Sequence, residues 1–208
     1  MTDALPTVHV VDDDASFRNS VARLLQASGY RVALYDSGEH FLRRDPEDAP
    51  GCILLDLQLP GLDGLDLQGR LAAQDNILPI VFLTGHGDIP MSVRAIKAGA
   101  DDVLSKPAGK DDLLAAIGRA ISRNSEARTR RERMNAMRIL VNSLTPRERE
   151  VFALVVRGKM NKQIAGELGT SERTIKAHRH AVMEKLKVQS LAEAVAIAER
   201  LGLLNARR

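Results

Sequence analysis

A short apolar run that ends at a single carboxylate constrains the fold of this chain more than any other feature. Residues 53–55 are Ile-Leu-Leu, Asp56 follows them, and the chain then enters a loop that contains Pro60 and Gly61. Such a run is typical of a strand that is buried on both faces of a parallel sheet. Parallel sheets bind ligands in the crevice beyond the carboxyl ends of their strands, and Asp56 would lie there. Asp56 is therefore the first candidate for a functional side chain.

The distribution of charge favours two domains. The 208 residues leave room for one large domain or two small ones. Residues 1–124 hold 12 Lys and Arg against 18 Asp and Glu, a net charge of −6, whereas residues 125–208 hold 18 against 9, a net charge of +9. An acidic half joined to a basic half predicts that the basic half faces nucleic acid or another polyanion. Aromatic residues make up only 3% of the chain, which disfavours a stacking platform for single strands.

Three further observations predict the setting of the protein. The sequence contains no apolar run of the about 18 residues that a membrane span needs. Its first residues, Met-Thr-Asp-Ala-Leu-Pro, lack the basic and apolar regions of a secretion signal. Cys52 is the single cysteine, which excludes an internal disulfide and fits a reducing compartment. We expect a cytoplasmic protein without membrane contact, in which Cys52 is a small buried apolar residue.

The first half of the chain alternates short β-branched runs with amphipathic helical patterns, which predicts βα units around a parallel sheet. The predicted strands are residues 7–11, 31–35, 52–57, 80–84 and 102–105. The predicted helices are residues 15–28, 37–44, 63–74, 89–98 and 110–123. Five strands and five helices in roughly 120 residues have the size of a flavodoxin-like domain of the α/β class. We place this domain at residues 1–123.

The rest of the chain is predicted to be helical. Residues 124–143 are mostly polar and contain no Pro or Gly, so we expect a helical linker there. Residues 144–208 are expected to form an all-α domain of four helices, two of which begin at the capping boxes of Thr145 and Ser190. The second and third of these helices are joined by residues 168–171, Leu-Gly-Thr-Ser. Their lengths and the glycine in the turn match a helix-turn-helix.

Polar side chains stand at the carboxyl ends of four predicted strands. Asp12 and Asp13 follow the first strand and Asp56 ends the third, while Thr84 ends the fourth and Lys106 follows the fifth. Because neighbouring carboxylates repel each other, several at one site imply a bound cation or raised pKa values. An all-oxygen site suits Mg²⁺, which would hold a phosphoryl group in line with one carboxylate. The ammonium and the hydroxyl can bind phosphoryl oxygens, so Asp56 is interpreted as a phosphoryl acceptor.

With these residues at these spacings, residues 1–123 resemble the receiver domain of two-component response regulators. The resemblance implies that Asp56 is the phosphoacceptor and that Asp13 and Asp56 bind Mg²⁺ directly. It also implies that the backbone carbonyl of Gln58 completes the protein ligands and that Asp12 orients a metal-bound water.

The resemblance also assigns the residues that switch the domain and tune its dephosphorylation. Lys106 would contact the phosphoryl group and form a cis peptide bond with the proline that follows it, and Thr84 would supply the switch hydroxyl. Receivers usually carry Tyr or Phe three residues before this lysine, where this chain has Val103, so the switch is expected to be atypical. Gln58 and His86 occupy positions that tune dephosphorylation.

The third helix of the second half combines an apolar back with a basic front. Its apolar positions recur at helical spacing, which predicts one buried stripe. The stripe consists of Ile175, His178, Val182 and Leu186. The opposite side carries Arg173, Lys176, His180 and Lys187, with Ala177 and Met183 beside them. A helix with a small and basic front can enter the major groove of DNA.

Residues 144–204 resemble the LuxR-type helix-turn-helix that follows receivers of the FixJ and NarL type. The resemblance rests on residues 144–151, 161–165 and 174–178. It implies base contacts from Lys176, Ala177 and His180. Contacts to phosphates are expected from Asn161, Lys162, Thr174 and Arg179, with Arg173 in the same front set. A dimer contact is implied for the apolar stripe of the last helix, which consists of Leu191, Val195, Ala198 and Leu201; packing within the domain is the alternative.

We therefore expect a two-component response regulator rather than an enzyme. A sensor histidine kinase would phosphorylate Asp56, and the homodimer would bind promoter DNA and activate transcription with RNA polymerase. One alternative is a constitutive DNA-binding regulator whose receiver is not phosphorylated and serves as a protein-interaction module, which Val103 and Ala108 favour. Another is a Mg²⁺-dependent phosphohydrolase, which would need a second carboxylate where the chain has Gln58.

Overall fold

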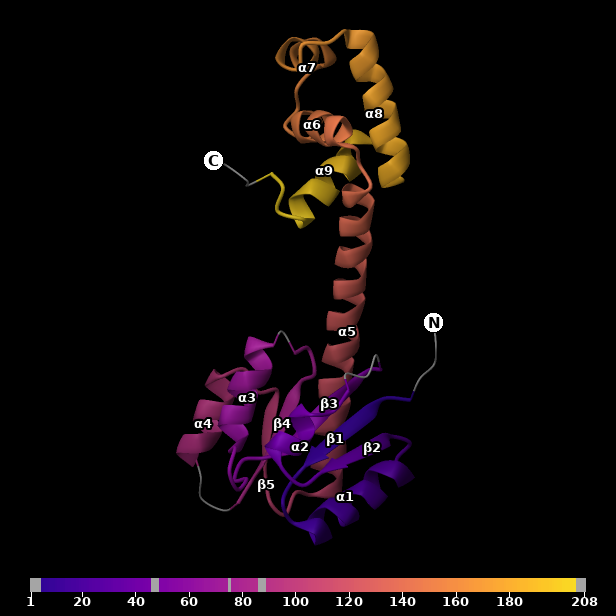
Figure 1. Ribbon diagram of the computed structural model, residues 1–208. Coiled ribbons are helices and arrows are strands. Elements are labelled where there is room, and N and C mark those ends of the chain that lie inside the picture. Colours follow the sequence, from indigo (N-terminus) through magenta and orange to yellow (C-terminus); the bar gives the residue numbers. More distant parts are fainter. Residues whose placement is uncertain (1–4, 46–48, 75, 86–88, 205–208) are drawn as a thin grey trace. The chain divides into compact units, whose positions relative to one another are not determined.

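The computed structural model divides the chain into two compact units, with the boundary between Arg128 and Thr129. It describes residues 5–45, 49–74, 76–85 and 89–204. Unit 1 contains the sheet and unit 2 is helical (Figure 1). Within these described stretches, no helix has both the length and the apolar character that crossing a membrane requires. The domain boundaries expected from the sequence, at 123/124 and 143/144, remain a proposal.

Five parallel strands form the sheet of unit 1. They are β1 (Thr7–Val11), β2 (Arg31–Tyr35), β3 (Gly51–Asp56), β4 (Ile80–Thr84) and β5 (Asp102–Ser105). Their order is β2-β1-β3-β4-β5, the flavodoxin-like order, which confirms the predicted fold class. The inner strands β1, β3 and β4 are buried along their whole length, because helices cover both faces. The strand that ends at Asp56 begins and ends one residue earlier than the sequence pattern predicts.

Helices cover both faces of this sheet (Figure 1). They are α1 (Ala15–Ala27), α2 (Gly38–Leu42), α3 (Gly64–Ala73), α4 (Ile89–Lys97) and α5 (Lys110–Asn142). Leu25 of α1 and Ile117 of α5 belong to the apolar core on one face. Phe41 of α2, Leu67 of α3 and Ala95 of α4 belong to the core on the other face. The helix α5 runs without a break through the predicted fifth helix and the predicted linker.

Gly64 allows α3 to begin directly beside the strand end that carries Asp56. A Cβ atom at position 64 would lie 2.6 Å from the backbone carbonyl oxygen of Asp56 and 2.9 Å from the ring of Phe82. The amide of Gly64 donates a hydrogen bond to the carbonyl of Leu57 at 3.2 Å. A larger residue could not keep this approach, so glycine at this position fixes the end of β3 against α3.

Unit 2 contains the end of α5 and the helices α6 (Pro146–Val155), α7 (Asn161–Glu167), α8 (Glu172–Leu186) and α9 (Leu191–Arg200). Both predicted caps stand where these helices begin, but only Thr145 forms a complete capping box, with Glu148 at the start of α6. Ser190 caps α9 by accepting a hydrogen bond from the amide of Glu193 at 3.2 Å, whereas the carboxylate of Glu193 accepts from the amide of Gln189 at 2.9 Å. The turn between α7 and α8 contains Gly169 with φ +62°. The predicted four-helix domain with a helix-turn-helix is therefore confirmed. His178, predicted to be buried, is half-buried.

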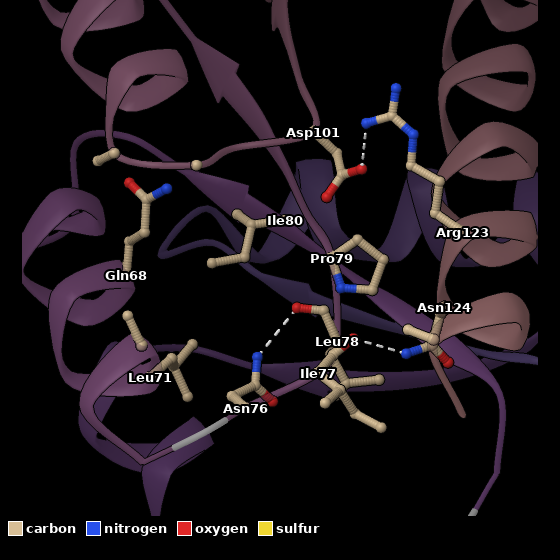
Figure 2. Close-up of a pocket in the computed structure, with 14 residues that line it drawn as sticks. Gln68, Leu71, Asn76, Ile77, Leu78, Pro79, Ile80, Asp101, Arg123 and Asn124 are labelled. Carbon is tan, nitrogen blue, oxygen red and sulfur yellow. Dashed lines mark hydrogen bonds and ion pairs between the residues drawn. The ribbon is translucent and has the colours of Figure 1, made fainter. Parts of the chain in front are cut away.

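Asn124 ties α5 to the amino edge of the sheet. Its side chain is 1% exposed. The side-chain amide donates to the carbonyl of Ile77 at 2.7 Å, and the side-chain oxygen accepts a hydrogen bond from the amide of Gly51 at 3.1 Å. Figure 2 shows this residue among those that line a cavity of about 290 Å³, where Arg123 pairs with Asp101 at 2.7 Å. The cavity lies at the amino end of β4, away from the edge that carries Asp56.

We expect that Asn124→Ala lowers the free energy of unfolding by about 1–3 kcal/mol, because it leaves a buried amide and a buried carbonyl without partners. Urea unfolding measures this change, and hydrogen exchange of the Gly51 amide should accelerate at the same time. The control is Asn135→Ala on the exposed part of the same helix, which should have little effect. Equal stability of the two variants would contradict the role of Asn124.

Candidate functional site

Three carboxylates gather at the carboxyl edge of the sheet. One oxygen atom from each of Asp12, Asp13 and Asp56 lies within 4.8 Å of the others. The pairing of Val11 with Leu55 in adjacent parallel strands brings the next residues, Asp12 and Asp56, side by side. Asp12 is fully buried and Asp56 is 6% exposed, whereas Asp13 is exposed. The cluster is therefore closed on the sheet side and open to solvent at Asp13.

Lys106 joins two of these carboxylates. Its ammonium lies 2.6 Å from one oxygen of Asp12 and 2.6 Å from one oxygen of Asp56. The backbone amide of Lys106 donates to the carbonyl of Thr84 at 2.6 Å, which continues the pairing of β4 with β5. The peptide bond between Lys106 and Pro107 is cis, as expected. The lysine thus reaches the carboxylates from the end of β5, which lies two strands from β3 and three strands from β1.

Burial and charge together shift the pKa values of two groups in this cluster. Burial raises the pKa of the Asp12 carboxyl, and the hydrogen bond from Lys106 offsets only part of that effect. Burial disfavours the ammonium of Lys106, but its hydrogen bonds to Asp12 and Asp56 outweigh burial and raise the pKa of Lys106. One ammonium faces three carboxylates, so the cluster keeps an excess of negative charge. Converging carboxylate oxygens with such an excess fit a hard cation such as Mg²⁺.

The loops that carry the carboxylates are held by local hydrogen bonds. The amide of Gln58 donates to the Asp56 side chain at 3.1 Å, so the loop after β3 folds back on its own carboxylate. The amide of Asp14 donates to the Asp12 side chain at 2.9 Å. Asp14 in turn caps α1 by accepting hydrogen bonds from the amides of Ser16 and Phe17. The carboxylates therefore sit on short, ordered turns, while the side chain of Gln58 is exposed.

The two residues expected to switch the domain occupy different surroundings. Thr84 is 6% exposed at the end of β4, and its hydroxyl donates to the carbonyl of Gly85 at 3.2 Å. Val103 is half-buried and packs in the apolar core that also contains Met91 and Ala100. His86, expected to tune dephosphorylation, lies outside the described residues.

The front of α8 is open to solvent. Its exposed residues include all the predicted base contacts, one predicted phosphate contact and the arginine of the predicted front set. They are Arg173, Thr174, Lys176, Ala177 and His180. On the other side, Ile175, Val182 and Leu186 are at most 2% exposed and pack into the cores of unit 2. The helix is thus oriented by its apolar back, and the small and basic front is left free for a partner.

Two predicted phosphate contacts bind each other. The guanidinium of Arg179 donates to the side-chain oxygen of Asn161 at 2.9 Å, which links α8 to the start of α7. Both residues are half-buried, whereas the neighbouring Lys162 is exposed. The Asn161–Arg179 hydrogen bond therefore fixes the geometry between the two helices of the helix-turn-helix.

The apolar stripe of α9 packs mainly into the core of unit 2. It was expected to contact a second copy of the chain. Ala198 is fully buried, and Val195 and Leu201 pack against the same core. Leu191 is 41% exposed at the start of the helix. Packing within the domain accounts for three of the four residues, so a dimer contact of α9 stays a proposal.

Two contacts in the structure were not predicted from the sequence. Glu148 was assigned to a capping box, but it also binds the ammonium of Lys185 on α8 at 2.6 Å. That hydrogen bond and the one from the amide of Thr145 lower the pKa of Glu148 to about 2. The ammonium of Lys106 lies against the ring of Phe17. Both contacts join residues far apart in the chain, and no local pattern marks them.

Comparison with known proteins finds two family models in this chain. The model described as "Response regulator receiver domain" matches residues 8–118. The model described as "Bacterial regulatory proteins, luxR family" matches residues 142–198. The first match contains the acidic cluster and Lys106, and the second contains α6, α7, α8 and most of α9.

Individual proteins resemble the chain over nearly its whole length. Nodulation protein W of Bradyrhizobium diazoefficiens is 43% identical over 94% of this chain and 86% of its own length. The response regulator protein TmoT of Ectopseudomonas mendocina is 40% identical over 97% of this chain and 91% of its own. The solved structure of the response regulator StyR has a TM-score of 0.85 at 48% identity, covering 95% of this chain and all of StyR. The structure of full-length FixJ from B. japonicum has a TM-score of 0.58 at 42% identity. The match covers 96% of this chain and 98% of FixJ.

We expect that Glu148→Gln lowers the stability of unit 2 by about 1 kcal/mol at neutral pH, a modest value because Lys185 is 37% exposed and water screens the pair. Since the pKa of Glu148 falls from 4.5 to about 2 on folding, its contribution is complete above 4.5 and is lost as the pH drops toward 2. Unfolding by urea at neutral and acid pH measures both effects. Glu150→Gln on the exposed side of α6 is the control. An acid-induced loss of stability that is as large in Glu148→Gln as in the unchanged protein would refute this assignment.

Proposed function

Because the chain belongs to the two-component response regulators that join a receiver domain to a LuxR-type DNA-binding domain, we propose that phosphorylation of Asp56 switches it and that it controls promoters as a homodimer. Members of this family are DNA-binding transcription regulators and not enzymes. A sensor kinase and DNA are the partners that this domain pair implies. The observation that carries the proposal is the acidic cluster bridged by Lys106.

In the proposed reaction, a carboxylate oxygen of Asp56 attacks the phosphorus atom of a phosphohistidine on the kinase. The new bond joins phosphorus to Asp56 as the bond between phosphorus and the imidazole nitrogen breaks, and the kinase histidine leaves as neutral imidazole, with the proton on its other ring nitrogen. Lys106 then exchanges its contact with the Asp56 carboxylate for one with a phosphoryl oxygen. The opening of the cluster at the exposed Asp13 gives the donor its approach.

The acidic cluster supports a Mg²⁺ site. Asp13, Asp56 and the backbone carbonyl of Gln58 would hold the ion, and Asp12 would orient one of its waters. The three carboxylates of the cluster supply the hard oxygen donors that such an ion needs. When bound, the ion would neutralise charge on the phosphoryl oxygens. Gln58 and His86 would tune the lifetime of the phosphorylated state.

A phosphoryl group would change the surroundings of Thr84. It adds a charge of about −1.5 to −2 and three acceptor oxygens. The hydroxyl of Thr84, which donates to the carbonyl of Gly85, can turn toward a phosphoryl oxygen and draw the start of the loop after β4 with it. Val103 packs in the same core as Met91 of α4. We infer that the response reaches α4 by repacking around Val103 rather than by rotation of an aromatic ring.

The surface of α4 supports dimerisation of the receiver. Three exposed apolar residues follow one another at spacings of four and three, which places them on one face of the helix. They are Ile89, Val93 and Ile96, and they are 74%, 46% and 49% exposed. Burying this stripe against a second copy would remove the apolar area from water. In the DNA-binding half, the exposed Leu191 would contribute to a contact of α9 with its counterpart.

On DNA, the α8 residues Lys176, Ala177 and His180 would meet base edges in the major groove. Arg173, Thr174 and Lys162 would contact phosphates, and the pair of Asn161 and Arg179 would do so as one linked unit. Two copies would bind two half-sites, and RNA polymerase would be recruited to activate transcription. If promoter DNA is its target, the protein would act in the cytoplasm.

We expect that Asp56→Asn abolishes phosphoryl labelling by acetyl phosphate in the presence of Mg²⁺, because the side-chain amide of asparagine, unlike a carboxylate, is not a nucleophile at neutral pH. Intact-mass spectrometry measures the labelling. The substitution Asp56→Asn should also abolish the rise in DNA affinity that phosphorylation causes, measured on a DNA site selected from a random pool. Asp66→Asn, on the exposed surface of α3, is the control and should label normally. Full DNA affinity without any labelling of the unchanged protein would instead favour a constitutive regulator.

We expect Lys176→Ala and Lys162→Ala to weaken DNA binding in different ways. Loss of a base contact at Lys176 should cost about 1–3 kcal/mol on the selected site and little on random DNA. Loss of a phosphate contact at Lys162 should weaken both alike and reduce the slope of log affinity against log salt by about one. Titrations at several salt concentrations measure both quantities. If the two variants lose the same affinity on both DNAs, the assignment of Lys176 to base edges is wrong.

A further inference from the structure

The ring of Phe17 lies against the ammonium of Lys106, and no step of the proposed reaction uses it. The nitrogen of Lys106 is 4.6 Å from the centroid of the ring. This distance is within the about 6 Å over which an aromatic face attracts a cation. Phe17 is half-buried in the first turn of α1, where it packs against the core between the sheet, α1 and α5. The ring is therefore anchored in the core and contacts the ammonium of Lys106 with its face.

The segment that carries the carboxylates also sets the position of this ring. The Asp14 side chain accepts hydrogen bonds from the amides of Ser16 and Phe17 at 2.8 and 3.2 Å, which fixes the first turn of α1. The amide of Asp14 donates to the side chain of Asp12, and the guanidinium of Arg18 donates to the carbonyl of Asp12. Residues 12–18 thus bring a carboxylate and an aromatic face to Lys106 in one rigid turn.

The ammonium of Lys106 needs contacts that fix its position, because the lysine side chain is a flexible four-carbon stem with a strongly hydrated ammonium group. Two of its N–H groups are used by Asp12 and Asp56, and its side chain is 22% exposed. When Asp56 accepts a phosphoryl group, the Asp56 carboxylate that held the ammonium becomes an acyl phosphate, a mixed anhydride in which the carboxyl group no longer carries its own charge. The ring of Phe17 does not change in that step, so it remains as a contact that keeps the ammonium over the site.

We propose that Phe17 is a positioning residue for phosphoryl transfer, whose ring face holds the Lys106 ammonium where the incoming phosphoryl oxygens arrive. The proposal rests on the phosphorylation of Asp56 described above. With acetyl phosphate as donor, the bond between Asp56 and phosphorus forms, the bond between phosphorus and the acetate oxygen breaks, and acetate leaves. Phe17 takes no part in these bonds and acts only through Lys106.

The test compares Phe17→Leu with Phe17→Tyr in the full-length protein. Leucine keeps an apolar side chain in the packed position but removes the ring face, whereas tyrosine keeps the face. The rate of labelling by acetyl phosphate with Mg²⁺ should fall about fivefold in Phe17→Leu and stay within about twofold in Phe17→Tyr. Urea unfolding confirms that both variants fold, and direct titration with Mg²⁺ confirms that the carboxylates are intact.

Two further measurements separate positioning from packing. The side-chain ε-methylene protons of Lys106 should show an upfield ring-current shift in nuclear magnetic resonance spectra of the unchanged protein and Phe17→Tyr, and lose it in Phe17→Leu. In a Lys106→Met background, Phe17→Leu should slow the residual labelling no further, because the cation that the ring holds is gone.

The outcomes distinguish this inference from the proposed function. Absence of labelling in the unchanged protein overturns the phosphorylation of Asp56 and the inference with it. Normal labelling of the unchanged protein together with an equally fast Phe17→Leu overturns only the role of Phe17. A slow Phe17→Tyr, or an equal effect of Phe17→Leu with and without Lys106, also overturns it, because packing rather than the ring face would then be responsible.

Discussion

The repulsion between Asp12 and Asp56 is the constraint on which the rest of unit 1 depends. Parallel pairing of β1 with β3 forces the two carboxylates together in a buried place, so the fold requires a cation there. Lys106 supplies one from the end of β5, and its arrival depends on the order of the strands and on the backbone contact with Thr84. Without Lys106, the two buried carboxylates would face each other with no positive charge between them.

The sequence predicted the sheet and the residues at its edge because both follow from simple rules. Buried parallel strands are continuous apolar runs, and their carboxyl ends meet at one edge, so Asp12, Asp56, Thr84 and Lys106 could be placed together without coordinates. Which carboxylates the lysine binds, and that Phe17 faces it, depend on side-chain directions that periodicity does not encode. The linker was predicted to be helical, as it is to Asn142, but its continuity with the preceding helix was not predicted, since a polar stretch without breakers fits one long helix or two.

In unit 2 the sequence predicted which face of α8 is exposed, and some residues that it assigned to DNA or to a second copy also have partners within the unit. The front of α8 is exposed as expected, because its apolar back was easy to recognise. Asn161 and Arg179 bind each other, and three residues of the α9 stripe pack within the domain. Polar and apolar groups at the ends of short helices can satisfy either the scaffold or a ligand, and composition alone does not separate the two. The ion pair of Glu148 with Lys185 joins residues 37 positions apart, beyond the reach of any local pattern.

The close contact at Gly64 has a consequence for how such a site can diverge. Since a single added carbon atom would collide with the carbonyl of Asp56, a residue other than glycine at position 64 would force the main chain around the proposed phosphoacceptor to move. Under the proposed function, the lifetime of the phosphorylated state would instead vary through side chains that project from this main chain, such as the exposed Gln58. The geometry of the proposed reaction and its duration would then be separable properties: the first depends on the main chain, and the second can vary one side chain at a time.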